Sequence, residues 1–166
     1  MNAKPENLVM TLAEIGIIHS PFKEPTGTPI QPVFSEGAEG TVEVLPQYAE
    51  GLRDLVGFDR IWLLYWFDRS SPARLRVMPF RDTSEHGIFA TRAPCRPNAI
   101  GMSCVRLLSV AANTLTIACV DILDGTPLLD IKPYVPQFDS YPKSRAGWLE
   151  RPGRESRTRA DARFVP

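Results

Sequence analysis

Two short segments of the sequence concentrate residues that can bind an anion or move a proton. The first, residues 87–103, reads GIFATRAPCRPNAIGMS and carries Arg92 and Arg96 among prolines. Because proline presets φ, Pro94 and Pro97 stiffen this loop, and little entropy remains to be lost when it binds a ligand. Two arginines held this way can grip a carboxylate or a phosphate. The alternative is a turn whose arginines only pair with carboxylates of the same domain.

The second segment, residues 121–136, reads DILDGTPLLDIKPYVP. It carries the carboxylates of Asp121, Asp124 and Asp130, and one lysine, Lys132. Carboxylates beside a Gly-Thr-Pro turn could bind a ribose, an amine or a cation, or activate a nucleophile. Aspartate before glycine also caps turns with its own side chain. For Asp124 taken alone, the turn is the favoured interpretation.

Missing motifs exclude several classes of enzyme. The sequence has no G-x-G-x-x-G after a strand, no G-x-x-x-x-G-K-[ST] and no G-x-S-x-G. Rossmann dinucleotide binding, P-loop hydrolysis and serine hydrolysis are therefore disfavoured. The two histidines are far apart, and the three cysteines lack Cys-x-x-Cys spacing. We expect neither a metal site nor a disulfide framework.

The charges of the chain are segregated although their sum is zero. Residues 1–59 carry 3 Lys/Arg and 9 Asp/Glu, residues 60–96 carry 7 and 3, residues 97–140 carry 2 and 4, and residues 141–166 carry 7 and 3. Most of the basic residues are arginines, whose planar fork suits phosphates and base edges. This pattern is compatible with a nucleic-acid partner, and equally with an ordinary solvated surface in an arginine-rich composition.

Length and hydropathy indicate one globular domain. The chain has 166 residues, 43% of them hydrophobic, and no uncharged apolar run of membrane-spanning length. The first residues, 1–11, lack the sections of a signal peptide. We expect a cytoplasmic protein with no membrane partner.

Strand-like runs alternate with loops rich in proline and glycine. We expect strands at residues 14–19, 40–45, 61–67, 87–91, 102–110, 114–122 and 128–131. The run at 61–67 (IWLLYWF) is predicted to be a central strand buried on both faces, and residues 46–55 a short helix. The long loop at 20–40 is expected to be functional. This pattern favours a mainly β fold, an antiparallel barrel or sandwich.

Four motifs in the same order resemble those of the TrmO (YaeB-like, TsaA-like) tRNA methyltransferases. They are the two segments above together with IGIIHSPFKEPTGTPIQP, which begins at residue 15, and RAGWL, which ends at residue 149. The resemblance implies a small antiparallel β-barrel over residues 15–150, not a Rossmann-like fold. Residues 1–14 would then be an N-terminal segment, and residues 151–166 an Arg-rich mobile tail.

The resemblance also implies a homodimeric enzyme that uses S-adenosyl-L-methionine. Its family reaction methylates N6 of the threonylcarbamoyl-adenosine next to the anticodon in tRNA. The cofactor-contacting positions carried over by motif are Gln31, Pro32, Val33, Phe67, Asp68, Arg92, Met102, Asp121, Ile122, Leu123 and Asp124. Long family members carry a further C-terminal domain thought to help bind tRNA, and the Arg-rich tail could take its place.

Physical roles can be assigned to these positions as hypotheses. Arg92 can hold the carboxylate of the methyl donor, and Met102 and Phe67 can cover its adenine. Asp124 or Asp68 could accept the proton of the nucleophilic nitrogen. Arg81, Arg96 and Lys132 are candidates for contacts with tRNA phosphates. Two alternatives stay open: a non-catalytic module that binds S-adenosylmethionine or RNA, and a metal-dependent hydrolase that uses the carboxylate cluster.

Overall fold

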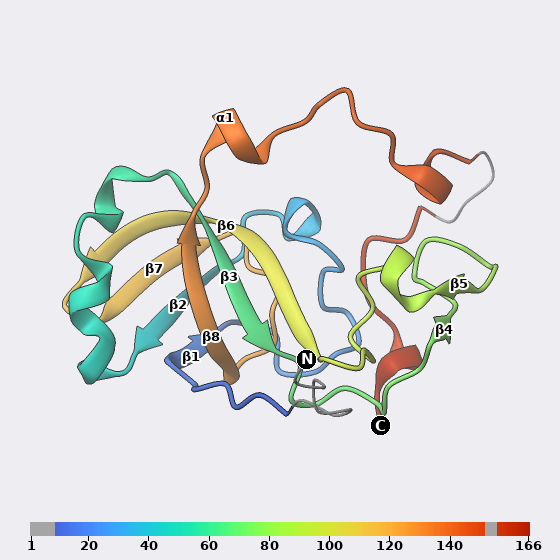
Figure 1. The fold of residues 1–166 in the computed structure, drawn as a ribbon, viewed down its shortest axis with the longest axis horizontal. Helices are drawn as coiled ribbons and strands as arrows, with labels where there is room; N and C mark the ends of the chain where they lie inside the picture. The colour runs from blue at the N-terminus through green and yellow to red at the C-terminus, as the bar shows by residue number, and fades with distance from the viewer. Residues whose placement is uncertain (1–8, 152–155) are drawn as a thin grey trace, which may run out of the picture.

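Six antiparallel strands close into a barrel in the computed structural model, which describes residues 9–151 and 156–166 (Figure 1). Around the barrel the strand order is β1-β2-β7-β6-β3-β8. The strands are β1 (Gly16–His19), β2 (Glu39–Val44), β3 (Arg60–Trp66), β6 (Ile100–Ala111), β7 (Thr114–Ala118) and β8 (Thr126–Pro133). The predicted antiparallel barrel is confirmed, and the sandwich alternative is not what forms.

Side chains that alternate along each strand fill the barrel interior. In β3, the side chains of Ile61, Leu63 and Tyr65 are buried, while Trp66 is 51% exposed. The prediction that this strand is buried on both faces is therefore wrong. A barrel is a single curved layer, so each strand has only one face turned to the core. The interior is completed by Ile18, Val42, Val44, Val105, Leu115, Ile117 and Leu128.

Tyr65 and Gly101 pack closely across two strands near one end of the barrel. The two residues are register partners in β3 and β6. A Cβ added to Gly101 would overlap the Cε2, Cζ and Cδ2 atoms of the Tyr65 ring. Glycine at this position therefore lets the Tyr65 ring lie flat against the β6 backbone.

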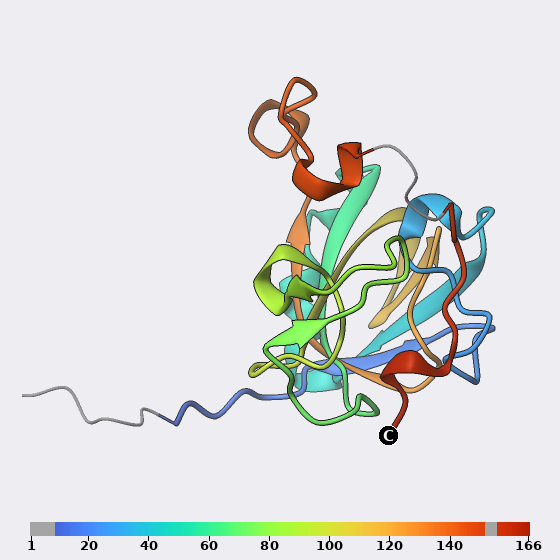
Figure 2. The ribbon, with the colours of Figure 1, turned by 90° about the vertical axis from the view of Figure 1, so that its right-hand side faces the viewer.

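The connections outside the barrel are short helical turns and one small hairpin. The 3-10 turns are η1 (Pro32–Phe34), η2 (Pro46–Leu52), η3 (Leu55–Gly57), η4 (Ile88–Ala90), η5 (Gly147–Glu150) and η6 (Ala162–Phe164), and the one α-helical turn of the described chain is α1 (Pro136–Asp139). The hairpin pairs β4 (Arg76–Val77) with β5 (His86–Gly87) and projects in front of the barrel in Figure 2. The strand predicted over residues 87–91 is thus mostly the turn η4, because Thr91 donates hydrogen bonds from both its backbone N–H and its hydroxyl back to the Ile88 carbonyl.

The last residues of the chain pack onto the domain. Backbone hydrogen bonds join Gly27 N–H to the Ala160 carbonyl at 2.9 Å and Ala160 N–H to the Thr28 carbonyl at 2.8 Å. Phe164 is buried in a second apolar cluster with Val77, Ile88 and Cys95. The expectation of a mobile tail does not fit residues 156–166, since a large apolar side chain anchors them. Residues 152–155 of that tail, and residues 1–8 of the expected N-terminal segment, lie outside the described residues.

No helix within residues 9–151 and 156–166 is long and apolar enough to cross a membrane. Nor do three or more His, Cys, Asp or Glu side chains of that part of the chain gather as a metal site would require.

Replacing Gly101 with alanine tests the tight pair. We expect Gly101→Ala to lower the free energy of unfolding by about 1–3 kcal/mol, because an added methyl must displace the Tyr65 ring. Urea denaturation measures this. The matched control is Gly51→Ala, where an added Cβ meets nothing within 4 Å. Equal stabilities for the two variants would contradict the packing described.

Candidate active site

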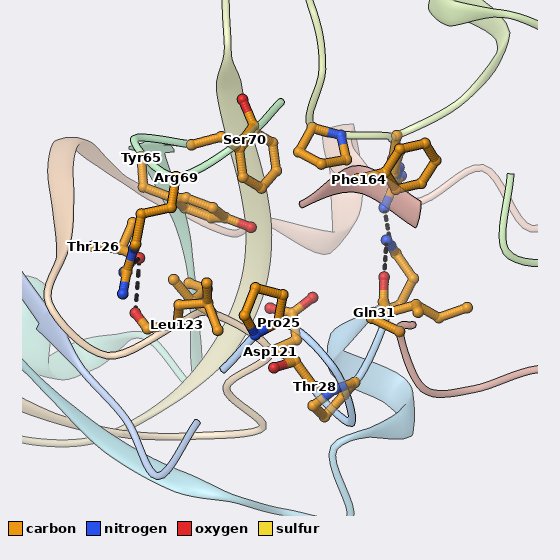
Figure 3. Close-up of a pocket in the computed structure, with 18 of the residues that line it drawn as sticks. Pro25, Thr28, Gln31, Tyr65, Arg69, Ser70, Asp121, Leu123, Thr126 and Phe164 are labelled. Carbon is orange, nitrogen blue, oxygen red and sulfur yellow. Dashed lines mark hydrogen bonds between the residues drawn. The ribbon is translucent and has the colours of Figure 1, made fainter. Parts of the chain in front are cut away.

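A cavity of about 300 Å³ opens at the end of the barrel where β3 ends and β6 and β8 begin (Figure 3). Because these strands are antiparallel, residues 67–70, 100–102 and 121–126 meet at this edge. The long loop contributes Pro25 and residues 28–31, and the C-terminal segment contributes Phe164. In Figure 3, Tyr65, Arg69 and Leu123 lie on one side of the cavity and Gln31 on the other.

A chain of hydrogen bonds runs from the barrel interior to this cavity. The Ser103 hydroxyl donates to Asp121 Oδ1 at 2.6 Å and lies 3.0 Å from the Tyr65 hydroxyl. Since serine has one hydroxyl proton, Tyr65 must donate to Ser103 while Ser103 donates to an ionised Asp121. Tyr65 and Asp121 both line the cavity. The chain therefore fixes the Asp121 side chain at the cavity floor.

The surroundings of this chain shift the titration of both acids. Loss of water around Asp121 raises the pKa of its carboxyl from 3.8 to about 7, against the lowering effect of the Ser103 hydrogen bond and the positive charge of Arg92. Burial, with the nearby negative charge of Asp121, raises the pKa of Tyr65 above its ordinary range. Tyr65 therefore stays protonated near neutral pH and can donate a hydrogen bond. The Asp121 carboxyl gains or loses its proton in the same pH range.

Arg92 provides a positive charge on another wall of the cavity. It follows η4 in the proline-containing loop, and its guanidinium donates to Gln31 Oε1 of the long loop. The side chain is exposed, and the positive charge lowers the pKa of Asp121. Arg92 and Asp121 thus face one cavity from different segments.

Arg69 ties the exit of β3 to the turn before β8. Its guanidinium donates to the Asp124 carbonyl at 2.8 Å and to the Thr126 hydroxyl at 3.2 Å. It also lies 3.4 Å from Asp68 Oδ1. These bonds hold Asp68 at the rim of the cavity.

Asp124 is not among the described residues that line the cavity. Its carboxylate is 2.6 Å from Lys23 Nζ and accepts a hydrogen bond from the Ser20 backbone N–H at 3.1 Å. These two bonds, the one to Lys23 foremost, lower the pKa of Asp124. The carboxylate thus joins the turn to the long loop through partners that lie outside the turn itself.

The remaining predicted residues divide between the cavity and other surfaces. Those that line it are Gln31, Phe67, Asp68, Arg92, Arg96, Met102, Asp121, Ile122 and Leu123. Pro32 and Val33 continue into η1, and Val33 is 80% exposed. Arg81 lines a neighbouring cavity instead.

Arg96 and Lys132 already have partners. One guanidinium nitrogen of Arg96 donates to the Thr91 carbonyl at 2.8 Å and the Ile88 carbonyl at 3.2 Å, so this side chain holds the loop that carries Arg92. Lys132 Nζ lies 2.7 Å from Asp130. Six residues along β8 from Thr126, Lys132 is roughly 20 Å from the cavity end of that strand.

Three cavity features could not be read from the sequence motifs. Tyr65 belongs to the apolar run of β3 and was expected only to fill the core. Ser103 ends the first motif but was assigned no role there, and its hydrogen bonds to Tyr65 and Asp121 depend on the barrel. Phe164 belongs to the segment expected to be mobile, where it is one of few large apolar residues.

The model of the tRNA-methyltransferase O N-terminal domain matches residues 17–140. The chain belongs to this TrmO family. A probable S-adenosyl-L-methionine-binding protein of Pyrococcus abyssi is 52% identical to it over 158 residues, covering 95% of this chain and 86% of that protein. The tRNA (adenine(37)-N6)-methyltransferase of Escherichia coli is 37% identical over 147 residues, covering 82% of this chain and 63% of that enzyme.

Solved structures agree with the TrmO fold. The crystal structure of TrmO from Pseudomonas aeruginosa superposes with a TM-score of 0.72 at 40% sequence identity. The match covers 85% of this chain and 63% of that chain, so the sequence spans less than two thirds of the TrmO protein.

The pH dependence of stability tests the position of Asp121. A folded-state pKa above 3.8 means that the folded protein binds this proton more tightly than the unfolded chain. The contribution of Asp121 to the free energy of unfolding is therefore fully present below pH 3.8, and it is lost as the pH rises to about 7.

We expect Asp121→Asn to remove that part of the pH dependence. Urea denaturation between pH 4 and 8 measures the free energy of unfolding of the wild type and the variant. As the pH rises, the variant should become more stable relative to the wild type. Asp130→Asn, which changes a carboxylate at the barrel surface, is the control. A constant difference between the wild type and Asp121→Asn would contradict the raised pKa.

Proposed function

We propose that the cavity binds S-adenosyl-L-methionine. This molecule carries a carboxylate, an ammonium group, ribose hydroxyls and an adenine. Arg92 supplies the cation for the carboxylate, while Asp121 and Asp68 supply acceptors for the ammonium or the hydroxyls. Phe67, Met102 and Leu123 offer apolar surface for the adenine, and Ile122 completes that wall. The names of several relatives as S-adenosyl-L-methionine-binding proteins support the same ligand.

Gln31, Pro32 and Val33 would contribute mainly through the loop that they form. Gln31 lines the cavity and is held by Arg92, whereas Val33 is exposed to solvent. We therefore assign the direct contacts to Gln31, with Pro32 and Val33 beside it, and we assign Asp124 to the turn that presents residues 121–123.

We propose further that the protein methylates N6 of threonylcarbamoyl-adenosine next to the anticodon in tRNA. The cofactor supplies a methyl group on a sulfonium sulfur. A bond forms between the nitrogen and the methyl carbon, the bond from carbon to sulfur breaks, and the nitrogen loses its proton. The protein accelerates this chiefly by holding the reactants in line. The name of the Escherichia coli relative supports the tRNA adenine as acceptor.

Three carboxylates can be compared as acceptors of that proton. Asp68 lies at the cavity rim, whereas Asp124 is engaged with Lys23 and has a lowered pKa, which makes it a weaker base. Asp121 lines the cavity, and its pKa of about 7 suits proton transfer near neutral pH. The geometry favours Asp68 and Asp121 over Asp124.

The observation that carries the proposal is that Arg92 and Asp121 face one partly apolar cavity at the barrel end. This combination suits a zwitterion with an attached heterocycle. A module that binds the same ligand without transferring a methyl group is the second candidate, and the relatives named only as binding proteins favour it. As the family resemblance implies, we also propose a cytoplasmic homodimer, with Arg81, Arg96 and Lys132 close to tRNA.

Arg92→Ala tests the ligand. We expect the variant to bind S-adenosyl-L-methionine about 10- to 100-fold more weakly, because a charge-assisted hydrogen bond to the carboxylate is lost. Isothermal titration calorimetry measures this. Arg106→Ala, on an exposed position of β6, is the control and should bind like the wild type. Equal affinities for all three proteins would refute the assigned carboxylate site.

Transfer of a labelled methyl group tests the reaction. We expect label from the donor to enter tRNA that lacks this modification, with nucleoside mass spectrometry locating it on N6 of threonylcarbamoyl-adenosine. Asp68→Asn and Asp121→Asn should reduce turnover at least tenfold, and Asp124→Asn should reduce it less.

The outcomes separate the two candidate functions. Tight cofactor binding without any transfer would support the binding module. Near-normal turnover of both Asp68→Asn and Asp124→Asn would exclude these two carboxylates as bases.

A further inference from the structure

A second cavity of about 550 Å³ adjoins the proposed cofactor cavity. The two cavities share Gln31, Thr91, Arg92 and Phe164 in their walls. The other lining residues of the second cavity are aromatic or apolar, among them Phe34, Phe89 and Trp148, together with the basic Arg81. A group bound in it would therefore lie directly beside a ligand in the first.

Phe89 is an aromatic side chain held out toward solvent. It is 77% exposed, although its neighbour Ile88 is buried. The turn that carries it is fixed by the Arg96 guanidinium, which donates to the Ile88 and Thr91 carbonyls, and by Ile88 N–H, which donates to the Leu75 carbonyl. A phenyl ring presented on so firmly held a turn is preorganised for stacking.

Trp148 is fixed beside the same turn. Its indole N–H donates to the Ala90 carbonyl at 2.8 Å, and its ring stacks on His86 with the centroids 4.4 Å apart. His86 is held in turn by Asp82, with 2.9 Å between His86 Nε2 and Asp82 Oδ2. The RAGWL segment thus completes the cavity wall from a distant part of the chain.

Arg81 brings a positive charge to this aromatic cavity. Its guanidinium carbon lies 5.4 Å from the centroid of the Phe34 ring. Its Nε atom is buried and has no hydrogen-bond partner among the described residues, and no ion pair joins it to a described carboxylate. Arg81 can therefore pair with an anion that comes from outside these segments.

We infer that the second cavity binds the acceptor nucleotide, with its base stacked against Phe89 and an anionic group held by Arg81. The inference rests on the proposed function, since it gives the acceptor a place beside the methyl donor. Exposed aromatic rings next to an arginine suit single-stranded nucleic acid, because every base has a face to stack and an anion nearby. An apolar peptide would leave Arg81 without a partner.

Two anions could bind Arg81, and both present negatively charged oxygens to its guanidinium. One is the carboxylate that the threonylcarbamoyl group adds to the base, and the other is an RNA phosphate. The acceptor is therefore supplied in two forms: a synthetic anticodon stem-loop with threonylcarbamoyl-adenosine, and the same stem-loop with unmodified adenosine.

The test measures the affinity of these RNAs by fluorescence anisotropy in the presence of S-adenosylhomocysteine, which prevents turnover. We expect Arg81→Ala to weaken binding of the modified RNA about 10- to 100-fold. We expect Phe89→Ala to weaken it roughly 5- to 100-fold, the usual effect of losing one stacked base. A loss for Arg81→Ala that is confined to the modified RNA identifies the carboxylate, and an equal loss for both RNAs identifies a phosphate.

Matched variants control for charge and for general surface effects. Arg53→Ala removes a charge near η2 whose side chain is 82% exposed, and Phe138→Ala removes a ring that is 63% exposed on α1. Both should bind RNA like the wild type. Calorimetry with S-adenosylhomocysteine checks that Arg81→Ala and Phe89→Ala retain the first cavity, so that a folding defect is recognised.

The results distinguish failure of this inference from failure of the proposed function. A wild-type protein that methylates tRNA, with an unchanged RNA affinity in either Arg81→Ala or Phe89→Ala, overturns the inference alone. A wild-type protein that methylates no RNA overturns the proposed reaction. In that case, weaker RNA binding by both Arg81→Ala and Phe89→Ala would still support the second cavity as a nucleotide site.

Discussion

The hydroxyl of Tyr65 connects the barrel core to the chemistry at the barrel end. Its ring is buried against Gly101, and its hydroxyl meets Ser103, which donates to Asp121. Because the ring and the hydroxyl are fixed by two neighbouring strands, the position of Asp121 follows from the register of β3 and β6. A one-residue slip of that register would turn Tyr65, Gly101 and Ser103 to the outside. The candidate active site therefore depends on a packing contact inside the barrel.

Loops without regular structure complete the site because side chains bind their backbone. The Ser20 hydroxyl donates to the Ile122 carbonyl at 2.6 Å, and the Thr28 hydroxyl donates to the Glu24 carbonyl at 2.8 Å. Residues 156–166 then lie beside the long loop, anchored by Phe164. Such bonds satisfy the backbone groups that a loop without strands would leave unpaired. They explain how a loop rich in proline and glycine, residues 20–38, can form one wall of a cavity.

The arginines at positions 81, 92 and 96 have different roles because their surroundings differ. Arg96 donates hydrogen bonds to backbone carbonyls and so positions the loop. Arg92 reaches the cavity, where a single neutral amide, Gln31, receives its hydrogen bond. Arg81 lies over the Phe34 ring with its Nε buried, and it lines the second cavity together with Phe89 and Trp148. Arg92 and Arg81 thus bring positive charges to two adjoining cavities.

The sequence by itself determined the mainly β fold and the loop segments that form the candidate site, and it named nine of the 26 residues that line the first cavity. Alternating apolar residues and proline-rich motifs are local signals, so they can be read without a structure. The tertiary structure alone decided that Asp124 faces Lys23 and that Arg96 holds a loop. It also decided that Tyr65 and Phe164 line the cavity and that Ser103 links Tyr65 to Asp121. These outcomes depend on contacts between segments far apart in the chain, such as Ser20 and Asp124 or Gly27 and Ala160, and on which partner lies beside each polar group. Residue type fixes what a side chain can bind, but its neighbours in space fix what it does bind.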